Sequence, residues 1–303
     1  MKHLLLILII TVGQAQAQYT PILSQYMFNG VALNPALTGS EESFSIIGSV
    51  RGQWVGFDGA PRTQVLTAHA PLLNKNSAFG AQLFSDQIGI TRNTGIYGMY
   101  SYKIMLDKSK ISLGISGGLN FIKSYYSRLE VVDQNDQEIM NDSRLGVLPD
   151  FSFGAHYSAT KYFISFSIPL FLTHLNEGAT FKLKNDFSNY TYMIGGGYLF
   201  KINDQVKLKP SLLGKFRQKN EPQFDFNLMA LLNENLEFGV SYRTKEAVIA
   251  MAAIKPTKQL TIMYSLGIPT TKIINYSFGS HELSLRYNFL YQSPIVGPRT
   301  LTW

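Results

Sequence analysis

The sequence of 303 residues contains no cysteine, and only 16% of its residues are charged. Without cysteine, disulfide bonds and lipid attachment at a mature N-terminal cysteine are excluded, so stability has to come from backbone ladders and packing. The charged fraction is well below the quarter or so that is usual for a soluble domain. After the first dozen residues no apolar stretch reaches about 18 residues, which excludes a helical membrane protein.

Aromatic residues, in contrast, are abundant, with 17 Tyr and 20 Phe, and 45% of all residues are hydrophobic. This composition argues against a disordered chain and favours a large all-β protein. The net charge of +7 comes from 27 Lys and Arg against 20 Asp and Glu. The basic residues are scattered and often lie at turns, so a nucleic-acid-binding stripe is not indicated.

The N-terminus has the organisation of a secretory signal peptide. Lys2 and His3 precede the apolar run 4–12, and an A-x-A site follows, with cleavage expected after Ala17. The alternative, a membrane anchor helix, is excluded because the run is too short to cross about 30 Å of hydrocarbon. We therefore expect a signal peptide at 1–17.

From residue 43 onward, segments of about ten residues alternate apolar with small or polar side chains. In residues 110–123, for example, Leu113 and Ile115 share one face with other apolar residues, whereas Ser112 and Ser116 share the other. A period of two over this length predicts strands. Fourteen such segments lie near 43–54, 63–71, 77–88, 94–106, 110–123, 149–159, 161–171, 189–200, 205–217, 222–232, 235–244, 246–255, 258–268 and 280–290.

The connections after even-numbered segments are short, whereas those after odd-numbered segments are mostly longer, with 124–148 and 172–188 the longest. Short turns on one side and long loops on the other are typical of outer-membrane barrels. The sequence therefore predicts an all-β transmembrane antiparallel barrel of about 14 strands, with short periplasmic turns and longer extracellular loops. We expect a periplasmic or plug-like segment at 18–42, the barrel at 43–290 and a periplasmic tail at 291–303. A soluble β-sandwich is the alternative, but its exposed face would carry more charge.

If the apolar faces meet lipid, the polar faces line the lumen and their charges have to pair. Registers centred on the turns predict Lys215 opposite Asp225, and Asp225 opposite Arg243. We interpret this ladder as structural pairing. A selectivity lining for a solute is the alternative function of these charges.

No catalytic, cofactor-binding or metal-binding constellation is recognisable. The five histidines lie on separate segments without H-x-x-H spacing, and the acidic stretch 133–138 lacks the glycine that an EF-hand loop requires. We therefore expect no enzymatic activity and no cofactor.

Two segments do not follow the strand pattern. Residues 18–40 are aromatic and turn-forming, with Asn34-Pro35 closing a possible short helix, and residues 51–61 read RGQWVGFDGAP. Aromatic residues and glycines in such a loop suggest a chain folded inward against a wall or a partner. Both segments contain residues of a recognisable motif: Gln25, Tyr26, Asn29, Asn34 and Pro35 in the first, and Gln53, Trp54, Gly56, Phe57, Gly59 and Pro61 in the second.

At these residues the chain resembles the PorP/SprF family of the type IX secretion system of Bacteroidetes. The spacing of the two blocks, the signal peptide and the late strand 281–285 agree with this resemblance. The resemblance implies an outer-membrane protein without catalytic residues, and it makes the motif positions candidate structural or docking residues.

The family further implies that the protein assists secretion or surface anchoring of a partner, such as a gliding adhesin. The expected partners are outer-membrane lipid and a secreted surface protein, periplasmic ring components of the secretion machine, or both. A passive outer-membrane channel or a hydrophobic-ligand transporter is the alternative, and an outer-membrane hydrolase is disfavoured because the sequence contains no motif for it.

Overall fold

The computed structural model describes residues 23–41, 43–72, 76–128, 142–143, 145–169, 173–177, 180–184, 187, 190–218, 220–233, 235–289 and 301. The expected signal peptide (1–17) and most of the loop 124–148 lie outside the described residues. So does the tail 291–303 except for Leu301, whose N–H donates a hydrogen bond to the carbonyl of Ala159.

The described residues form a closed antiparallel barrel of 14 strands, which confirms the predicted fold class. Its strands are β1 (Phe44–Gly52), β2 (Arg62–Pro71), β3 (Ser77–Ile88), β4 (Thr91–Met105), β5 (Ser109–Ser124), β6 (Gly146–Ala159), β7 (Tyr162–Ile168), β10 (Tyr192–Tyr198), continued by β11 (Phe200–Lys201), β12 (Val206–Arg217), β13 (Asn220–Leu232), β14 (Leu236–Arg243), β15 (Ala247–Ile254), β16 (Leu260–Pro269) and β17 (Ser280–Phe289).

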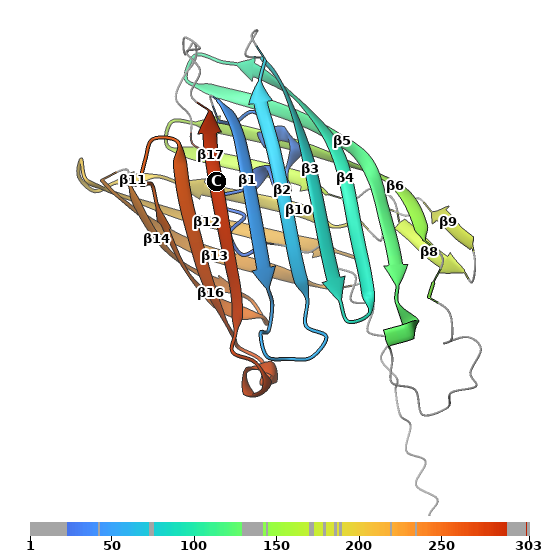
Figure 1. Cartoon of the computed structure of the whole chain (residues 1–303). Coiled ribbons are helices and arrows are strands. Elements are labelled where there is room, and N and C mark those ends of the chain that lie inside the picture. Colours follow the sequence, from blue (N-terminus) through green and yellow to red (C-terminus); the bar gives the residue numbers. More distant parts are fainter. Residues whose placement is uncertain are drawn as a thin grey trace, which may run out of the picture.

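Strands that follow each other in the sequence are neighbours in the wall (Figure 1). The barrel closes where the first strand, β1, pairs with the last strand, β17, from Phe44 opposite Phe289 to Gly52 opposite His281. On the other side, β10 bridges β7 and β12. Each described barrel strand therefore has a hydrogen-bonded neighbour on both sides along part of its length, as a structure in lipid requires.

The two faces of the wall differ as the period-two pattern predicts. In β5, Leu113, Ile115 and Leu119 are exposed on the outside, whereas Ser112 and Ser116 are buried. Exposed large apolar side chains recur on the outer face of the other strands, which is the surface that meets lipid in an outer-membrane barrel. Within the described part of the chain, no helix combines the length and the apolar character needed to cross a membrane.

We call the end of the barrel at the turns β2–β3, β4–β5 and β13–β14 the short-turn end, and the opposite end the long-loop end. Three elements at the long-loop end were not predicted. The expected loop 172–188 contains a separate hairpin, β8 (Thr173–Glu177) paired with β9 (Thr180–Lys184). The other two are 3-10 helices: η3 (Tyr126–Arg128) follows β5, and η5 (Lys272–Tyr276) precedes β17. All three are short local structures, which carry little periodic signal.

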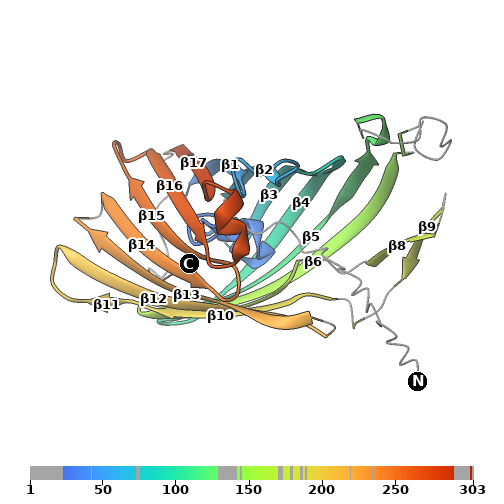
Figure 2. The ribbon, with the colours of Figure 1, turned by 90° about the horizontal axis from the view of Figure 1, so that it is seen from below.

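The N-terminal segment 23–41 lies inside the barrel, where Figure 2 shows it in blue between the walls. Most of its side chains are buried, including Leu23, Tyr26 and Leu37. It contains two 3-10 helices, η1 (Gly30–Ala32) and η2 (Pro35–Leu37), in place of the single short helix that Asn34-Pro35 suggested. Pro35 begins η2, because a proline is accommodated at the first helical position.

Candidate functional site

The first motif block fastens the N-terminal segment to β17. The N–H groups of Ser24 and Gln25 donate to the two carboxylate oxygens of Glu282, at 2.6 and 3.1 Å. The Gln25 amide donates to the Glu282 carbonyl at 2.8 Å and to Ser265 Oγ on β16 at 3.2 Å. Because all of these groups are buried, the carboxylate and the backbone donors satisfy each other away from water.

The next motif residues reach other strands. Tyr26 Oη accepts a hydrogen bond of 2.8 Å from the amide of Asn227 on β13. The amide of Asn29 donates to Thr67 Oγ1 on β2 at 3.2 Å. Between these two residues, Arg286 of β17 donates to the carbonyl of Phe28. The segment is therefore held from several directions within the lumen.

Asn34 is the most connected residue of the motif. Its amide nitrogen donates to Ser165 Oγ at 2.8 Å and to the carbonyls of Phe166 and Ala155 at 3.1 and 3.3 Å, while its Oδ1 accepts the Ala36 N–H at 2.9 Å. This last bond caps η2. Asn34 therefore ties the start of η2 to both β6 and β7.

Two glycines of the wall make room for this turn. A β-carbon on Gly154 of β6 would overlap Oδ1 of Asn34, and one on Gly114 of β5 would overlap the backbone of Pro35 and Ala36. Both positions face the lumen, and their nearest inward neighbours on the same strands, Ser112 and Ser116 on β5 and Ser152 and His156 on β6, carry side chains. The absence of a side chain is thus what lets the segment approach the wall.

The segment ends at the short-turn end of the barrel. Gly39, in the left-handed region with φ of 67°, donates its N–H to His69 Nδ1 of β2 at 3.1 Å. Lys103 of β4 donates to the Gly39 carbonyl, and Ser101 Oγ donates to the Thr38 carbonyl at 2.7 Å. Residues 24–39 thus run from the level of Glu282, near the long-loop end, to the level of Lys103.

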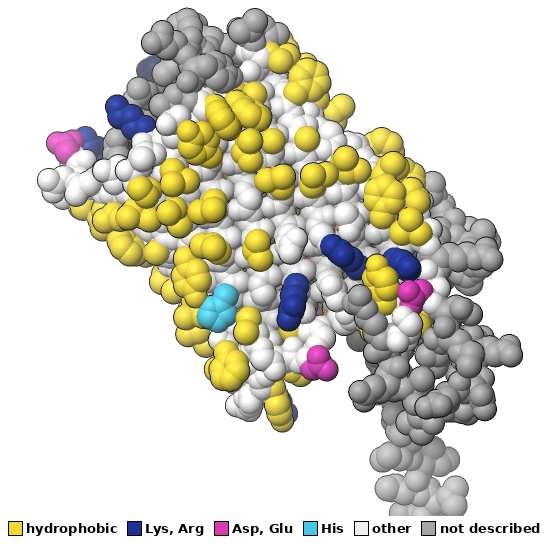
Figure 3. Space-filling model, viewed as in Figure 1, with side chains coloured by type: hydrophobic (Ala, Val, Ile, Leu, Met, Phe, Trp, Pro, Cys, Tyr) yellow, Lys and Arg dark blue, Asp and Glu magenta, His cyan; other side chains and the backbone are white. Residues whose placement is uncertain are grey.

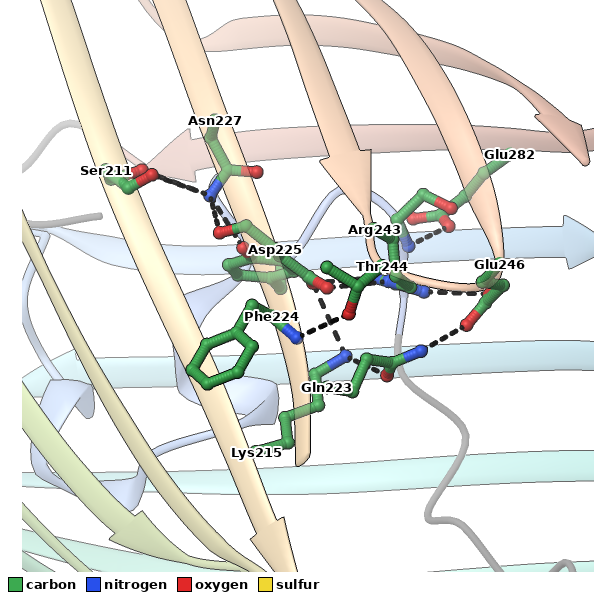
Figure 4. Close-up of polar contacts among 12 residues, drawn as sticks. Ser211, Lys215, Gln223, Phe224, Asp225, Asn227, Arg243, Thr244, Glu246 and Glu282 are labelled. Atoms are coloured by element: carbon green, nitrogen blue, oxygen red, sulfur yellow. Dashed lines mark hydrogen bonds and ion pairs between the residues drawn. The ribbon is translucent and has the colours of Figure 1, made fainter. Parts of the chain in front are cut away.

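The predicted charged residues meet in the lumen near the long-loop end (Figure 4). Asp225 accepts two hydrogen bonds from Arg243, each of 3.0 Å, and lies 3.4 Å from Lys215 Nζ. Asp225 is directly opposite Arg243, the register that the sequence predicted. The predicted register of Lys215 was wrong by two residues, because Lys215 is opposite Gln223, but the predicted ion pair with Asp225 forms diagonally.

Glu246, in the turn between β14 and β15, extends this charge cluster. It accepts from Arg243 at 3.2 Å and from the Gln223 amide at 2.9 Å, and it lies 3.6 Å from Arg51 of β1. Burial alone would raise the pKa of Glu246, but attraction to Arg243, Arg51 and Lys215 outweighs it and lowers the pKa to about 2. The cluster contains three cations, Arg51, Lys215 and Arg243, and three carboxylates, those of Asp225, Glu246 and the nearby Glu282. This balance of charges favours structural pairing over a selectivity lining.

The second motif block forms the loop between β1 and β2 at the long-loop end. Its backbone pairs with the segment before β17: the Val55 N–H donates to Gly279 and the Phe278 N–H donates to Val55, at 2.8 and 2.7 Å. Gly59 accepts from the N–H of Gly89 in the β3–β4 turn at 2.9 Å. The sequence suggested a loop folded against a wall or a partner, and these backbone bonds show that the loop extends the wall.

Trp54 and Gly56, at φ of 49° and 93°, take left-handed conformations that shape this loop, and Gly59 does so at 70°. Around them Val55 and Phe57 are exposed, together with Ile274, Tyr276 and Phe278 of the neighbouring segment, where Phe278 is 82% exposed. We call Val55, Phe57, Ile274, Tyr276 and Phe278 the loop platform. Gln53 and Pro61 close its base, with the Gln53 N–H donating to the Pro61 carbonyl at 2.9 Å.

The residues that sequence reasoning missed are the partners of the motif in the wall: Glu282, Asn227, Ser165, Gly114 and Gly154. The sequence did contain a signal for Glu282: it is a carboxylate among small inward residues of the last strand. Because a buried charge without a partner is costly, a binding partner for Glu282 could have been expected. In the part of the chain that the structure describes, no group of three or more His, Cys, Asp or Glu side chains could hold a metal ion.

Solved structures with a similar fold are outer-membrane barrels. The toluene transporter TbuX of Ralstonia pickettii has a TM-score of 0.52 at 12% identity over 88% of this chain and 93% of its own. The monoaromatic hydrocarbon channel CymD has a TM-score of 0.50 at 11% identity over 89% and 94%. At these identities the likeness shows the fold alone. No curated protein matches the chain significantly in sequence.

The family model of the type IX secretion system membrane protein PorP/SprF matches residues 15–287, which contain both motif blocks and all the barrel strands except the end of β17. The barrel fold and this match together place the protein in the outer membrane as a component of that secretion system. The chain belongs to the PorP/SprF family of type IX secretion system membrane proteins.

Proposed function

We propose that this protein is a non-enzymatic outer-membrane component that assists the secretion or surface anchoring of a partner protein, with a gliding adhesin as one candidate cargo. The proposal rests on the different positions of the two motif blocks, one inside the lumen and one at the long-loop end. The first block, from Gln25 to Pro35, fastens a segment across the lumen. The second block, from Gln53 to Pro61, presents apolar side chains beyond the wall.

The fastened segment favours a role that does not pass solutes through the lumen. Its hydrogen bonds reach β2, β4, β6, β7, β13, β16 and β17, so moving it aside would require many buried groups to lose their partners at once. Each buried donor or acceptor left unpaired costs about 1–3 kcal/mol. A segment held in this way supports a barrel that serves as a rigid anchor.

The loop platform is the part of the molecule that we propose binds the secreted partner. Exposed aromatic and aliphatic side chains grouped at one end of a molecule are typical of a protein-binding surface. The backbone bonds between Val55 and residues 278–279 hold the two loops together, which lowers the entropy that binding would cost. The motif glycines Gly56 and Gly59 support this shape.

Affinity purification of the tagged protein from native outer membranes tests this function. We expect a large secreted protein to be recovered with the wild type and to be lost from the triple variant Val55→Ser/Phe57→Ser/Phe278→Ser. The variant Ile202→Ser/Phe200→Ser, which removes exposed apolar side chains at the short-turn end, is the matched control. Recovery of the same partner with both variants would contradict docking at the loop platform.

Deletion of the gene separates this function from the alternative, a passive channel or hydrophobic-ligand transporter. The alternative draws support from the transport roles named for TbuX and CymD, and from an apolar groove of about 590 Å³ on the wall beside Leu212, Phe226 and Tyr242. We expect deletion to remove a specific surface protein and to leave small-solute uptake intact. Large steady currents of the purified protein in planar bilayers, with normal surface display in the deletion strain, would favour the channel instead.

A further inference from the structure

Three cations lie in one row on the outer face of the wall, at the long-loop end of β2 to β5. Arg62 of β2 is opposite Gln87 of β3, Gln87 is opposite Arg92 of β4, and Arg92 is opposite Lys123 of β5. Because neighbouring strands are about 4.8 Å apart, the three cations fall within roughly 15 Å of each other. We call Arg62, Gln87, Arg92 and Lys123 the basic row.

The basic row borders the apolar belt of the same wall. On each of these strands, the residue four positions closer to the short-turn end is apolar and exposed. These residues form a second row, Leu66, Leu83, Ile96 and Leu119. Between the two rows lie Gln64, Ser85, Thr94 and Phe121. Figure 3 shows this order, with hydrophobic side chains over the middle of the face and Lys and Arg side chains near the long-loop end.

Within the described strands, the row of cations does not continue past β2. Continued in the other direction, the same row passes through Gly52 of β1, His281 of β17 and Leu266 of β16, none of which is a Lys or Arg. The long-loop ends of β14 and β15 carry Tyr242 and Val248 on the outside. The basic row is therefore a local feature and not a general property of the barrel rim.

The carboxylates that the structure describes neutralise this row only in part. Asp142 lies 3.5 Å from Lys123, and Asp86 of β3 is buried on the inner face, where it accepts from Thr63. Among the described residues, no carboxylate lies within ion-pair distance of Arg62 or Arg92, and Arg92 Nε donates instead to Ser85 Oγ at 3.1 Å. Within the described part of the chain, two guanidinium groups at the edge of the lipid-facing surface thus keep free donors.

We propose that the basic row binds the phosphate groups of a phosphorylated lipid in the leaflet that surrounds the long-loop end. A guanidinium group matches a phosphate with paired N–H donors, and long basic side chains extend from an apolar surface to the headgroup level. The Gln87 amide lies between the two arginines and adds a neutral donor to the row. The acyl chains of such a lipid then lie against Leu66, Leu83, Ile96 and Leu119.

Native mass spectrometry of the full chain in a neutral detergent tests the site, with diphosphorylated lipid A, its dephosphorylated form and phosphatidylcholine as probes. We expect the wild type to retain the diphosphorylated lipid preferentially. Because each basic residue near a membrane surface contributes attraction to anionic lipid, Arg62→Gln/Arg92→Gln is expected to weaken retention by about tenfold or more. Lys245→Gln/Lys272→Gln, which removes two charges at the long-loop end outside the basic row, is the matched control.

Retention that falls equally in both double variants, or a wild type that retains all three lipids alike, would overturn the proposal. Displacement of the lipid by millimolar inorganic phosphate alone would overturn the assignment to a lipid, because it would show that the acyl chains contribute nothing. Recovery of an acidic protein on the basic row in place of lipid would also count against it. Heat-modifiable migration in gels checks that both variants form the barrel.

Discussion

Gly154 of β6 and Asn34 of the lumenal segment lie so close that a β-carbon on the glycine would overlap the side-chain oxygen of the asparagine. The same asparagine makes three donor contacts to β6 and β7. The hydrogen bonds of Asn34 to the wall therefore require a glycine at position 154.

The substitution Gly154→Ala should displace Asn34 from its pocket and destabilise the protein by about 1–3 kcal/mol, through overpacking and the loss of buried hydrogen bonds. Urea unfolding in detergent measures the free energy. Gly98→Ala on β4 is the control, because a β-carbon there meets nothing within 4 Å. Equal stabilities of the two variants would show that the lumenal segment does not need a glycine at position 154.

Glu282 is expected to decide whether the lumen stays closed. The variant Glu282→Ala removes both acceptors of the Ser24 and Gln25 N–H groups and one carboxylate of the charge cluster. We expect residues around 24–25 to become cleavable by protease and the conductance in planar bilayers to rise. Glu282→Gln, which keeps an acceptor, should show a smaller change in both measurements, and Asn288→Ala on the same strand should show none.

Substitutions in the charge cluster should lower the free energy of unfolding by different amounts, depending on which residue is replaced. Asp225→Ala leaves Arg243 and Lys215 buried without their shared carboxylate, at a cost of about 3–5 kcal/mol. Asp225→Asn keeps one acceptor and should cost less. Lys215→Met leaves the bidentate pair of Arg243 and Asp225 intact, so we expect the smallest loss of unfolding free energy. The reverse order, with Lys215→Met the most damaging, would contradict central placement of Asp225.

Stability should also fall in acid because of Glu246. The folded pKa of this group, about 2, is below its ordinary value of 4.5, so its contribution is fully present above pH 4.5 and is lost as the pH falls toward 2. The shift corresponds to at most about 3 kcal/mol. Urea midpoints between pH 6 and 2 measure it, and Glu246→Gln should flatten the dependence in that window. An unchanged slope in the variant would exclude Glu246 as the titrating group.

The wall could be predicted from the sequence because its pattern is local. Alternation in stretches such as 110–123 locates a strand without knowledge of its neighbours. The register of Asp225 and Arg243 followed from the short turn 233–235, which leaves little freedom. Between β12 and β13 the same reasoning failed, because β13 begins at Asn220, two residues earlier than expected, and a register shift falls between Lys215 and Arg217.

The lumenal contacts could not be predicted, because their partners are remote in sequence. Ser24 and Glu282 are separated by 258 positions, and Asn34 and Ser165 by 131. The motif identified Gln25 and Asn34 as candidate structural residues, but it did not indicate which strands they bind. The outward course of the β1–β2 loop was hidden for a similar reason: it depends on backbone bonds to residues 278–279.

The hydrogen bonds from Ser24 and Gln25 to Glu282 also connect the lumenal segment to the closure of the barrel. The first described residues of the chain are secured by its last strand, the strand that closes the barrel against β1. A barrel without β17 would lose both carboxylate acceptors at the start of the segment and keep the hydrogen bond from Gln25 to Ser265 of β16. Closure of the wall and attachment of this end of the segment therefore depend on the same strand.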